Sequence, residues 1–133
     1  MQWVLDSERP VYVQLVEQIQ AGIISGQYKP GDRLPSVRDL AAEATVNPNT
    51  MQRALTELER VGLVYANRTS GRFITPDEEM IGKLREQSAR QQAAAFLVKL
   101  RQLGFEPPQA LALLQQVIQD MKAEMGRREE TQQ

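Results

Sequence analysis

The sequence predicts a mainly α-helical protein, with three helices and a β-hairpin in residues 1–75 and two more helices after them. Three observations support this fold class. Apolar side chains recur at helical spacing within 10–26, 36–45 and 47–62, two strand-like runs flank a turn within 63–75, and further helical patterns follow residues 76 and 107. We expect boundaries at 1–75, 76–126 and 127–133, the last being a disordered tail.

Proline, serine and glycine delimit the first two helices. The first is expected from Pro10 to Gly26, because apolar side chains recur every four residues between them. A Pro-Gly pair then breaks the chain within a turn, QYKPGDRLP. Ser36, followed three residues later by Asp39, resembles a capping box, so a second, short helix is expected to begin there and to end near Thr45.

The third helix has the clearest signals. Asn47 is a good N-cap, Pro48 suits the first helical position, and Gly62 supplies the stop. Its apolar stripe consists of Met51, Leu55, Leu58 and Val61. Polar side chains occupy the first turn and the other face, namely Asn49, Thr50, Gln52, Arg53 and Glu57. A polar first turn on a helix held by its apolar back is typical of a helix that reads DNA base edges.

Residues 63–66 and 72–75 read as strands joined by 67–71, a segment rich in residues that tolerate unusual backbone angles. Arg68 and Arg72 stand at its shoulders. Three helices followed by such a hairpin predict a winged helix-turn-helix. In that fold both arginines can follow phosphates into a narrow minor groove, with Gly71 permitting close approach of the backbone.

The composition excludes several classes. The chain is 41% hydrophobic and 25% charged, and no apolar run approaches the length of a membrane span, so we expect a cytoplasmic protein. It has no cysteine or histidine, so we expect no transition metal and no cofactor. Net charge is −1, and basic and acidic side chains are equal in number within 1–75, so any positive surface must be local.

The last two helices are expected to form a homodimer. We expect Thr75 to cap the first, with Glu78 at the reciprocal position, and the second to run from Pro107 to about Gly126. Two helices joined by a short loop cannot bury all their apolar side chains, and a second copy would cover them. The expected dimer residues are Leu84, Phe96, Leu100, Leu103, Leu111, Leu114, Ile118 and Met121. A two-fold dimer suits double-stranded DNA with an inverted repeat.

Residues 10–75 resemble the GntR family of bacterial transcription regulators. The matching motifs are PVYVQ, IISGQYKPGDRLPSVRDLA and VNPNTMQRALTELERVGLV. The short remainder resembles the YtrA-type subfamily, whose members often control ABC-transporter operons. The resemblance implies a dimeric, usually repressing regulator. It identifies no small-molecule effector, and the chain departs from the family pattern at Ala44-Thr45 and in having one glycine in its wing.

The same resemblance implies DNA contacts at Arg38, in the NPNTMQ segment and around Gly71. In that segment they fall on Asn47, Asn49, Thr50 and Gln52. Ser36 and Arg53 are expected phosphate partners. An arginine can give two hydrogen bonds to guanine, and asparagine or glutamine can pair with adenine, which suits Arg38, Asn49 and Gln52.

Other interpretations remain open from the sequence. Arg38 can be an exposed arginine paired with Asp39 or Glu43, the hairpin can be a solvated turn, and Asn47 caps its helix with or without DNA. The competing function is a winged-helix protein-interaction module without sequence-specific DNA binding. An enzyme is a third class, for which the sequence offers no recognisable nucleophile, P-loop or carboxylate pair.

Overall fold

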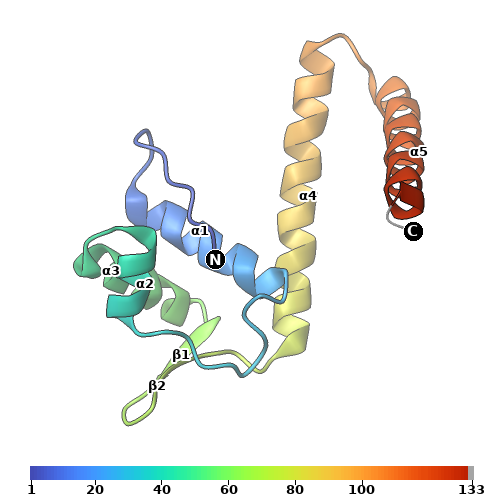
Figure 1. Ribbon diagram of the computed structural model, residues 1–133. Coiled ribbons are helices and arrows are strands. Elements are labelled where there is room, and N and C mark those ends of the chain that lie inside the picture. Colours follow the sequence, from blue (N-terminus) through green and yellow to red (C-terminus); the bar gives the residue numbers. More distant parts are fainter. Residues whose placement is uncertain (132–133) are drawn as a thin grey trace. The chain divides into compact units, whose positions relative to one another are not determined.

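The computed structural model describes residues 1–131, and its contacts divide the chain into two compact units, Met1–Glu86 and a second that begins at Gln87. Figure 1 shows the order of the elements, which confirms the fold class predicted from the sequence. They are α1 (Val11–Ile24), α2 (Val37–Ala44), α3 (Pro48–Arg60), β1 (Val64–Asn67), β2 (Gly71–Ile74), α4 (Glu78–Gln102) and α5 (Pro107–Thr131).

Side-chain caps fix where α2 and α3 begin, as the sequence predicts. The Ser36 hydroxyl accepts a hydrogen bond from the Asp39 backbone N–H at 3.1 Å, and the Asn47 carboxamide oxygen accepts one from the Asn49 N–H at 2.8 Å. Thr45, between the two helices, adopts a left-handed conformation with φ 58°. This short corner sets α3 at an angle to α2, which is the helix-turn-helix.

The core of the first unit lies between the three helices and the hairpin. Ten of its largest side chains are almost wholly buried, and burial of each apolar one contributes roughly 1.5–3 kcal/mol. They are Leu15, Ile19, Ile23, Leu40, Met51, Leu55, Leu58, Ile74, Gln14 and Val64. The buried face of α3 is therefore the predicted stripe, except that Val61 is exposed.

The wing differs from the prediction by one residue and has an additional partner. Its strands pair in antiparallel register, with Tyr65 opposite Phe73 and Asn67 opposite Gly71. The segment predicted only as a turn then adds to β2: the Leu34 N–H donates to the Arg72 carbonyl at 2.8 Å. The sequence gives no periodic signal for so short a pairing, which depends on a distant strand.

The N-terminal segment also packs on the first unit, which the sequence did not predict. Trp3 and Leu5, together with Met1, are half-buried against the core. The buried Gln14 carboxamide holds this segment, because its oxygen accepts from the Asp6 N–H at 2.8 Å and its nitrogen donates to the Arg9 carbonyl at 2.9 Å. Residues 1–9 therefore cover one side of α1.

The expected limits of the last helices require two corrections. Asp77, not Thr75, caps α4: its carboxylate accepts from the Met80 N–H at 3.1 Å, while the Thr75 hydroxyl, two residues before, accepts from the Asp77 N–H. Helix α5 continues to Thr131, past the predicted end at Gly126. Ion pairs from Glu124 to Arg127 and Arg128 support the added turn. The rest of the predicted tail, 132–133, lies outside the described residues.

Candidate nucleic-acid interface

The first turn of α3 presents polar side chains to solvent. Asn49, Gln52 and Arg53 are exposed and Thr50 is half-buried, while the opposite side of the helix is fixed in the core. The Asn47 side chain is occupied as the N-cap. The exposed Asn49 side chain stands at the start of the helix. At this place, exposed N–H groups and the helix dipole favour anions such as phosphate.

Arg53 is positioned by an aromatic ring on a different helix. Its guanidinium carbon lies 3.7 Å from the ring centroid of Tyr12 on α1. The two side chains, with Asn49 and Thr50, line an open depression of about 650 Å³. A cation over a ring keeps its full charge and its N–H donors, so Arg53 is held in place without being neutralised.

The start of α2 carries Ser36 and Arg38, both exposed. The Ser36 oxygen accepts its cap bond from the backbone, but the hydroxyl proton is still free to be donated to a phosphate. Arg38 has no carboxylate within ion-pairing distance among residues 1–131, so the alternative in which it pairs with Asp39 or Glu43 does not hold.

The two arginines of the wing have different surroundings. Arg68 is exposed at the turn, beside the Asn67 side chain that organises it. Arg72 instead donates from Nε to Glu59 Oε1 of α3 at 2.6 Å, and their side chains are only 22% and 29% exposed. This ion pair ties the wing to α3 and leaves Arg72 less exposed than its predicted contact with DNA requires.

The arginines of the first unit fall into two groups, those with a carboxylate partner and those without one. Arg9 and Arg60 pair with acids, Glu17 and Glu57 respectively. The hydrogen bond from Arg60 lowers the pKa of the Glu57 carboxyl below its ordinary value. In the described part of the chain the arginines of this unit without a carboxylate partner are Arg33, Arg38, Arg53, Arg68 and Arg85.

The sequence did not single out two members of this group, Arg33 and Arg85, and Arg85 donates to the Ile24 carbonyl at 3.4 Å. Arg33 lies on the segment that pairs with β2, opposite Phe73. A signal for it existed, since it is a basic residue three positions before the Ser36 cap, but its place beside the wing depends on a pairing that the sequence did not predict. No group of histidine, cysteine or acidic side chains in residues 1–131 is arranged to hold a metal ion.

The second unit exposes apolar side chains. Among the predicted dimer residues, Phe96, Leu103, Leu111, Ile118 and Met121 are exposed and Leu114 is half-buried. Leu84 instead packs on the core of the first unit, and Leu100 is buried. These two leucines consequently have little surface left for a second copy.

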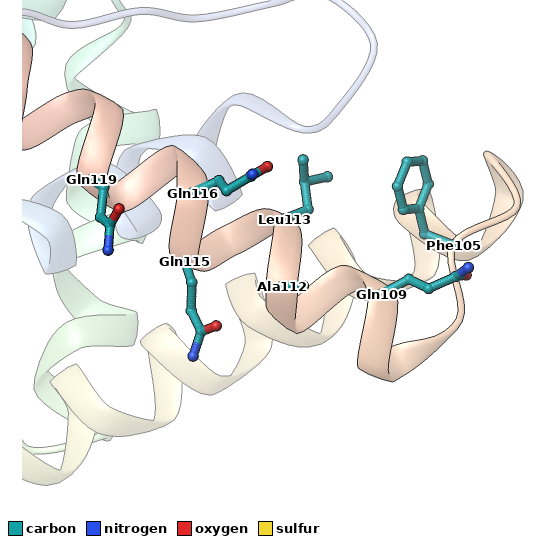
Figure 2. Close-up of a pocket in the computed structure, with 7 residues that line it drawn as sticks. All are labelled: Phe105, Gln109, Ala112, Leu113, Gln115, Gln116 and Gln119. Atoms are coloured by element: carbon teal, nitrogen blue, oxygen red, sulfur yellow. The ribbon is translucent and has the colours of Figure 1, made fainter.

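Another side of α5 is polar. An open depression of about 580 Å³ is lined by four glutamines as well as Phe105 and Leu113. Figure 2 shows these side chains. The glutamines are Gln109, Gln115, Gln116 and Gln119. Apolar and amide-bearing sides on one helix indicate which side an apolar partner would cover. No helix within residues 1–131 is long and apolar enough to cross a membrane.

Comparison with known proteins agrees with this geometry. The model of the family described as bacterial regulatory proteins, gntR family, matches residues 11–74. The HTH-type transcriptional regulator YhcF of Bacillus subtilis (strain 168) is 36% identical over 105 residues, which cover 79% of this chain and 87% of the relative. The HTH-type transcriptional repressor YtrA of the same organism is 44% identical over 69 residues, covering 52% and 53% of the two chains.

A solved structure supports the same conclusion over more of the fold. The GntR family transcriptional regulator from Listeria monocytogenes superimposes with a TM-score of 0.78 at 36% identity, covering 84% of this chain and 98% of that one. Members of the family are DNA-binding transcription regulators and not enzymes. The helix-turn-helix and the wing are both present, and the chain belongs to the gntR family of bacterial regulatory proteins.

Proposed function

We propose that this DNA-binding regulator is a homodimeric repressor that recognises an inverted-repeat operator. The observation that carries the proposal is the exposed polar start of α3, together with arginines that no acid among residues 1–131 neutralises. Base edges are read by such side chains in the major groove, and phosphates attract uncompensated cations. In the bacterial cytoplasm, a dimer bound over a promoter would exclude other proteins from it.

The side chains at the start of α2 and α3 have different proposed roles. Arg38 would bind a guanine through two hydrogen bonds, and Asn49 and Gln52 would pair with adenine edges. Thr50, Ser36 and Arg53 would hold phosphates, while Asn47 supports the helix as its cap. The wing would reach the adjacent minor groove through Arg68, with Arg72 fixing it to α3.

The proposed dimer rests on the apolar side of α5. Its members recur at alternating spacings of three and four residues, which is the pattern of a helix packed against another helix. They are Leu111, Leu114, Ile118, Met121 and Met125. Four of the five are at least half exposed, and their removal from water would drive association. Two-fold symmetry then gives two recognition helices for two half-sites.

The proposal extends to the regulated genes. We propose that they include an ABC-transporter operon, because the short C-terminal region resembles the YtrA-type subfamily. The test is transcript measurement in cells with and without the gene. Higher transcript levels of neighbouring transporter genes in the deletion strain would support both repression and this target, and unchanged levels would contradict the target.

A footprint on the promoter of the protein's own gene tests DNA recognition. The wild-type protein should protect a symmetric site at low ionic strength, and added salt should weaken binding steeply. Arg38→Ala should lose about 1–3 kcal/mol of discrimination between the site and its altered-guanine version while staying folded.

Arg60→Ala is the matched control, since Arg60 is exposed on α3 but paired with Glu57. It should discriminate like the wild type. Equal discrimination by Arg38→Ala and wild-type protein would contradict the role of Arg38, and an absent or asymmetric footprint would contradict the whole proposal.

A further inference from the structure

Two arginines lie on neighbouring strands at the base of the wing. Arg33 belongs to the segment before α2, and Arg72 belongs to β2. Two backbone hydrogen bonds hold the segments together, from the Leu34 N–H to the Arg72 carbonyl and from the Ile74 N–H to the Asp32 carbonyl, each 2.8 Å. The wing is therefore a backbone ladder of β1, β2 and residues 32–34.

The two arginines project from opposite faces of this ladder. Arg33 is paired with Phe73, so its side chain shares the face of Phe73 and of Tyr65, which stacks on Phe73 with ring centroids 5.6 Å apart. Arg72 is the next residue along β2 and projects from the other face, towards Glu59 of α3. One arginine is thus neutralised and half-buried, and the other is exposed.

The Arg33 side chain packs on Gly71, and this contact is called the seat of Arg33. A Cβ atom on Gly71 would lie 3.3 Å from Arg33 Nε and 3.4 Å from Nη2, so the guanidinium lies directly over the bare α-carbon. The φ of Gly71 is also +104°, a conformation that other residues rarely adopt. The glycine expected to admit a DNA backbone therefore already admits a side chain of this protein.

The charge of Arg33 is uncompensated. No carboxylate of residues 1–131 lies within ion-pairing distance of it. Its neighbour Asp32 is occupied elsewhere, because its carboxylate accepts a hydrogen bond from the Lys29 N–H at 3.2 Å. Arg33 consequently lies against Gly71, and its guanidinium has no acidic partner among residues 1–131.

We propose that Arg33 is the phosphate-binding cation of the wing, a role that rests on the proposed DNA recognition. Arg33 lies between the Ser36 cap of α2 and Gly71 of the wing. If α3 reads the major groove and the wing reaches the adjacent minor groove, the sugar-phosphate backbone between the two grooves would pass this position. A guanidinium offers two parallel donors to a phosphate, and seating it on Gly71 reduces the freedom lost on binding.

The test measures the salt dependence of operator binding by full-length variants, using the DNA site that wild-type protein protects in a footprint. Arg33→Ala should weaken binding about three- to tenfold and lower the slope of log affinity against log salt by about one, because one phosphate contact is lost. Arg33→Lys should keep most of the slope. Thermal melting of each variant checks that it is folded.

Two controls separate this role from a structural one. Lys29→Ala removes an exposed charge from the same loop and should change neither affinity nor slope. Arg72→Ala should lower the melting temperature, because it breaks the tie to Glu59, while leaving the salt slope unchanged. An unchanged slope in Arg33→Ala, or a loss as large in Lys29→Ala, overturns the inference.

A double-mutant cycle tests the seat itself. The φ of Gly71 strains an alanine in either background, so the diagnostic quantity is the difference between them: if Gly71 acts through Arg33, Gly71→Ala should weaken binding less when Arg33 is already alanine than in the wild-type background. Strictly additive losses overturn the seating. Wild-type protein that binds no operator overturns the proposed function together with this inference, whereas wild-type binding with an unaltered slope in Arg33→Ala overturns this inference alone.

Discussion

At the scale of single residues, the partners of each arginine separate structural from available charge. Arg60 and Arg72 lie on or beside the recognition helix, yet each is paired with a glutamate. Arg53 also lies on α3, but it stacks on the ring of Tyr12 and is not paired with a glutamate. Because a ring positions a cation without cancelling its charge, Arg53 is the arginine of α3 best prepared for a phosphate.

This pairing makes Tyr12 a positioning residue for DNA binding. Tyr12→Leu should weaken operator affinity about two- to fivefold, the equivalent of the 0.5–1 kcal/mol of an exposed cation–π contact, because Arg53 would lose its preferred position. Tyr12→Phe keeps the ring and should bind nearly as the wild type does. Titrations by fluorescence anisotropy measure both variants.

The Arg53→Ala background provides the check. There, Tyr12→Leu should have little further effect, since the two side chains would no longer interact. A twofold or greater loss in that background would show that Tyr12 acts by another route.

At the scale of elements, the caps of α2 and α3 determine where the reading side chains stand. Each cap satisfies a backbone N–H that helix geometry leaves without a partner, so each helix begins at a defined residue. Pro48 and the left-handed Thr45 fix the corner between them. A shift of α3 by one residue would turn Asn49 and Gln52 away by about 100°, which follows from its pitch.

Replacement of Asn47 should therefore change stability, and replacement of Asn49 should change DNA binding. Asn47→Ala should lower the free energy of unfolding by about 1 kcal/mol, because an N–H at the start of α3 loses its acceptor. Asn49→Ala should leave stability unchanged and weaken operator binding. Urea denaturation and gel-shift titration, applied to both, measure the difference.

Asn47→Ser is the conservative control, because serine is also a good cap, and it should retain most of the stability. If Asn47→Ala is as stable as the wild type but binds DNA poorly, Asn47 contacts the duplex rather than serving mainly as the cap.

At the scale of the whole molecule, the two units have different relations to solvent. The first buries its apolar residues around a core of its own, whereas the second leaves Leu103, Met121 and several others largely in water. A folded region with that much exposed apolar surface indicates a partner. The spacing along α5 makes a second copy of the chain the proposed one.

Removal of residues 107–133 should give monomers that bind the operator weakly, because the proposed dimer surface and the second half-site contact are both lost. Analytical ultracentrifugation measures the oligomeric state. As a finer change in the full chain, Ile118→Glu should dissociate the dimer, and Gln119→Glu, on the polar side, should not. Dimers of full affinity after truncation would place the interface elsewhere.

The sequence alone was sufficient for the parts of this protein that depend on neighbours along the chain. Caps, prolines, glycines and apolar spacing located α1, α2 and α3 closely, because these signals act within one or two helical turns. The hairpin was located to within one residue. The family resemblance adds DNA contacts on α3 that stay predictions, and the structure shows that Asn49, Gln52 and Arg53 are exposed.

The tertiary structure alone decided which charges and which apolar groups are available. It joined residues 32–34 to β2, seated Arg33 on Gly71, paired Arg72 with Glu59 and packed Leu84 on the first core. Each of these contacts joins segments distant in sequence, or depends on which face of a strand a residue occupies. No local propensity encodes such contacts, since their free energy appears only when the partner segment is already in place.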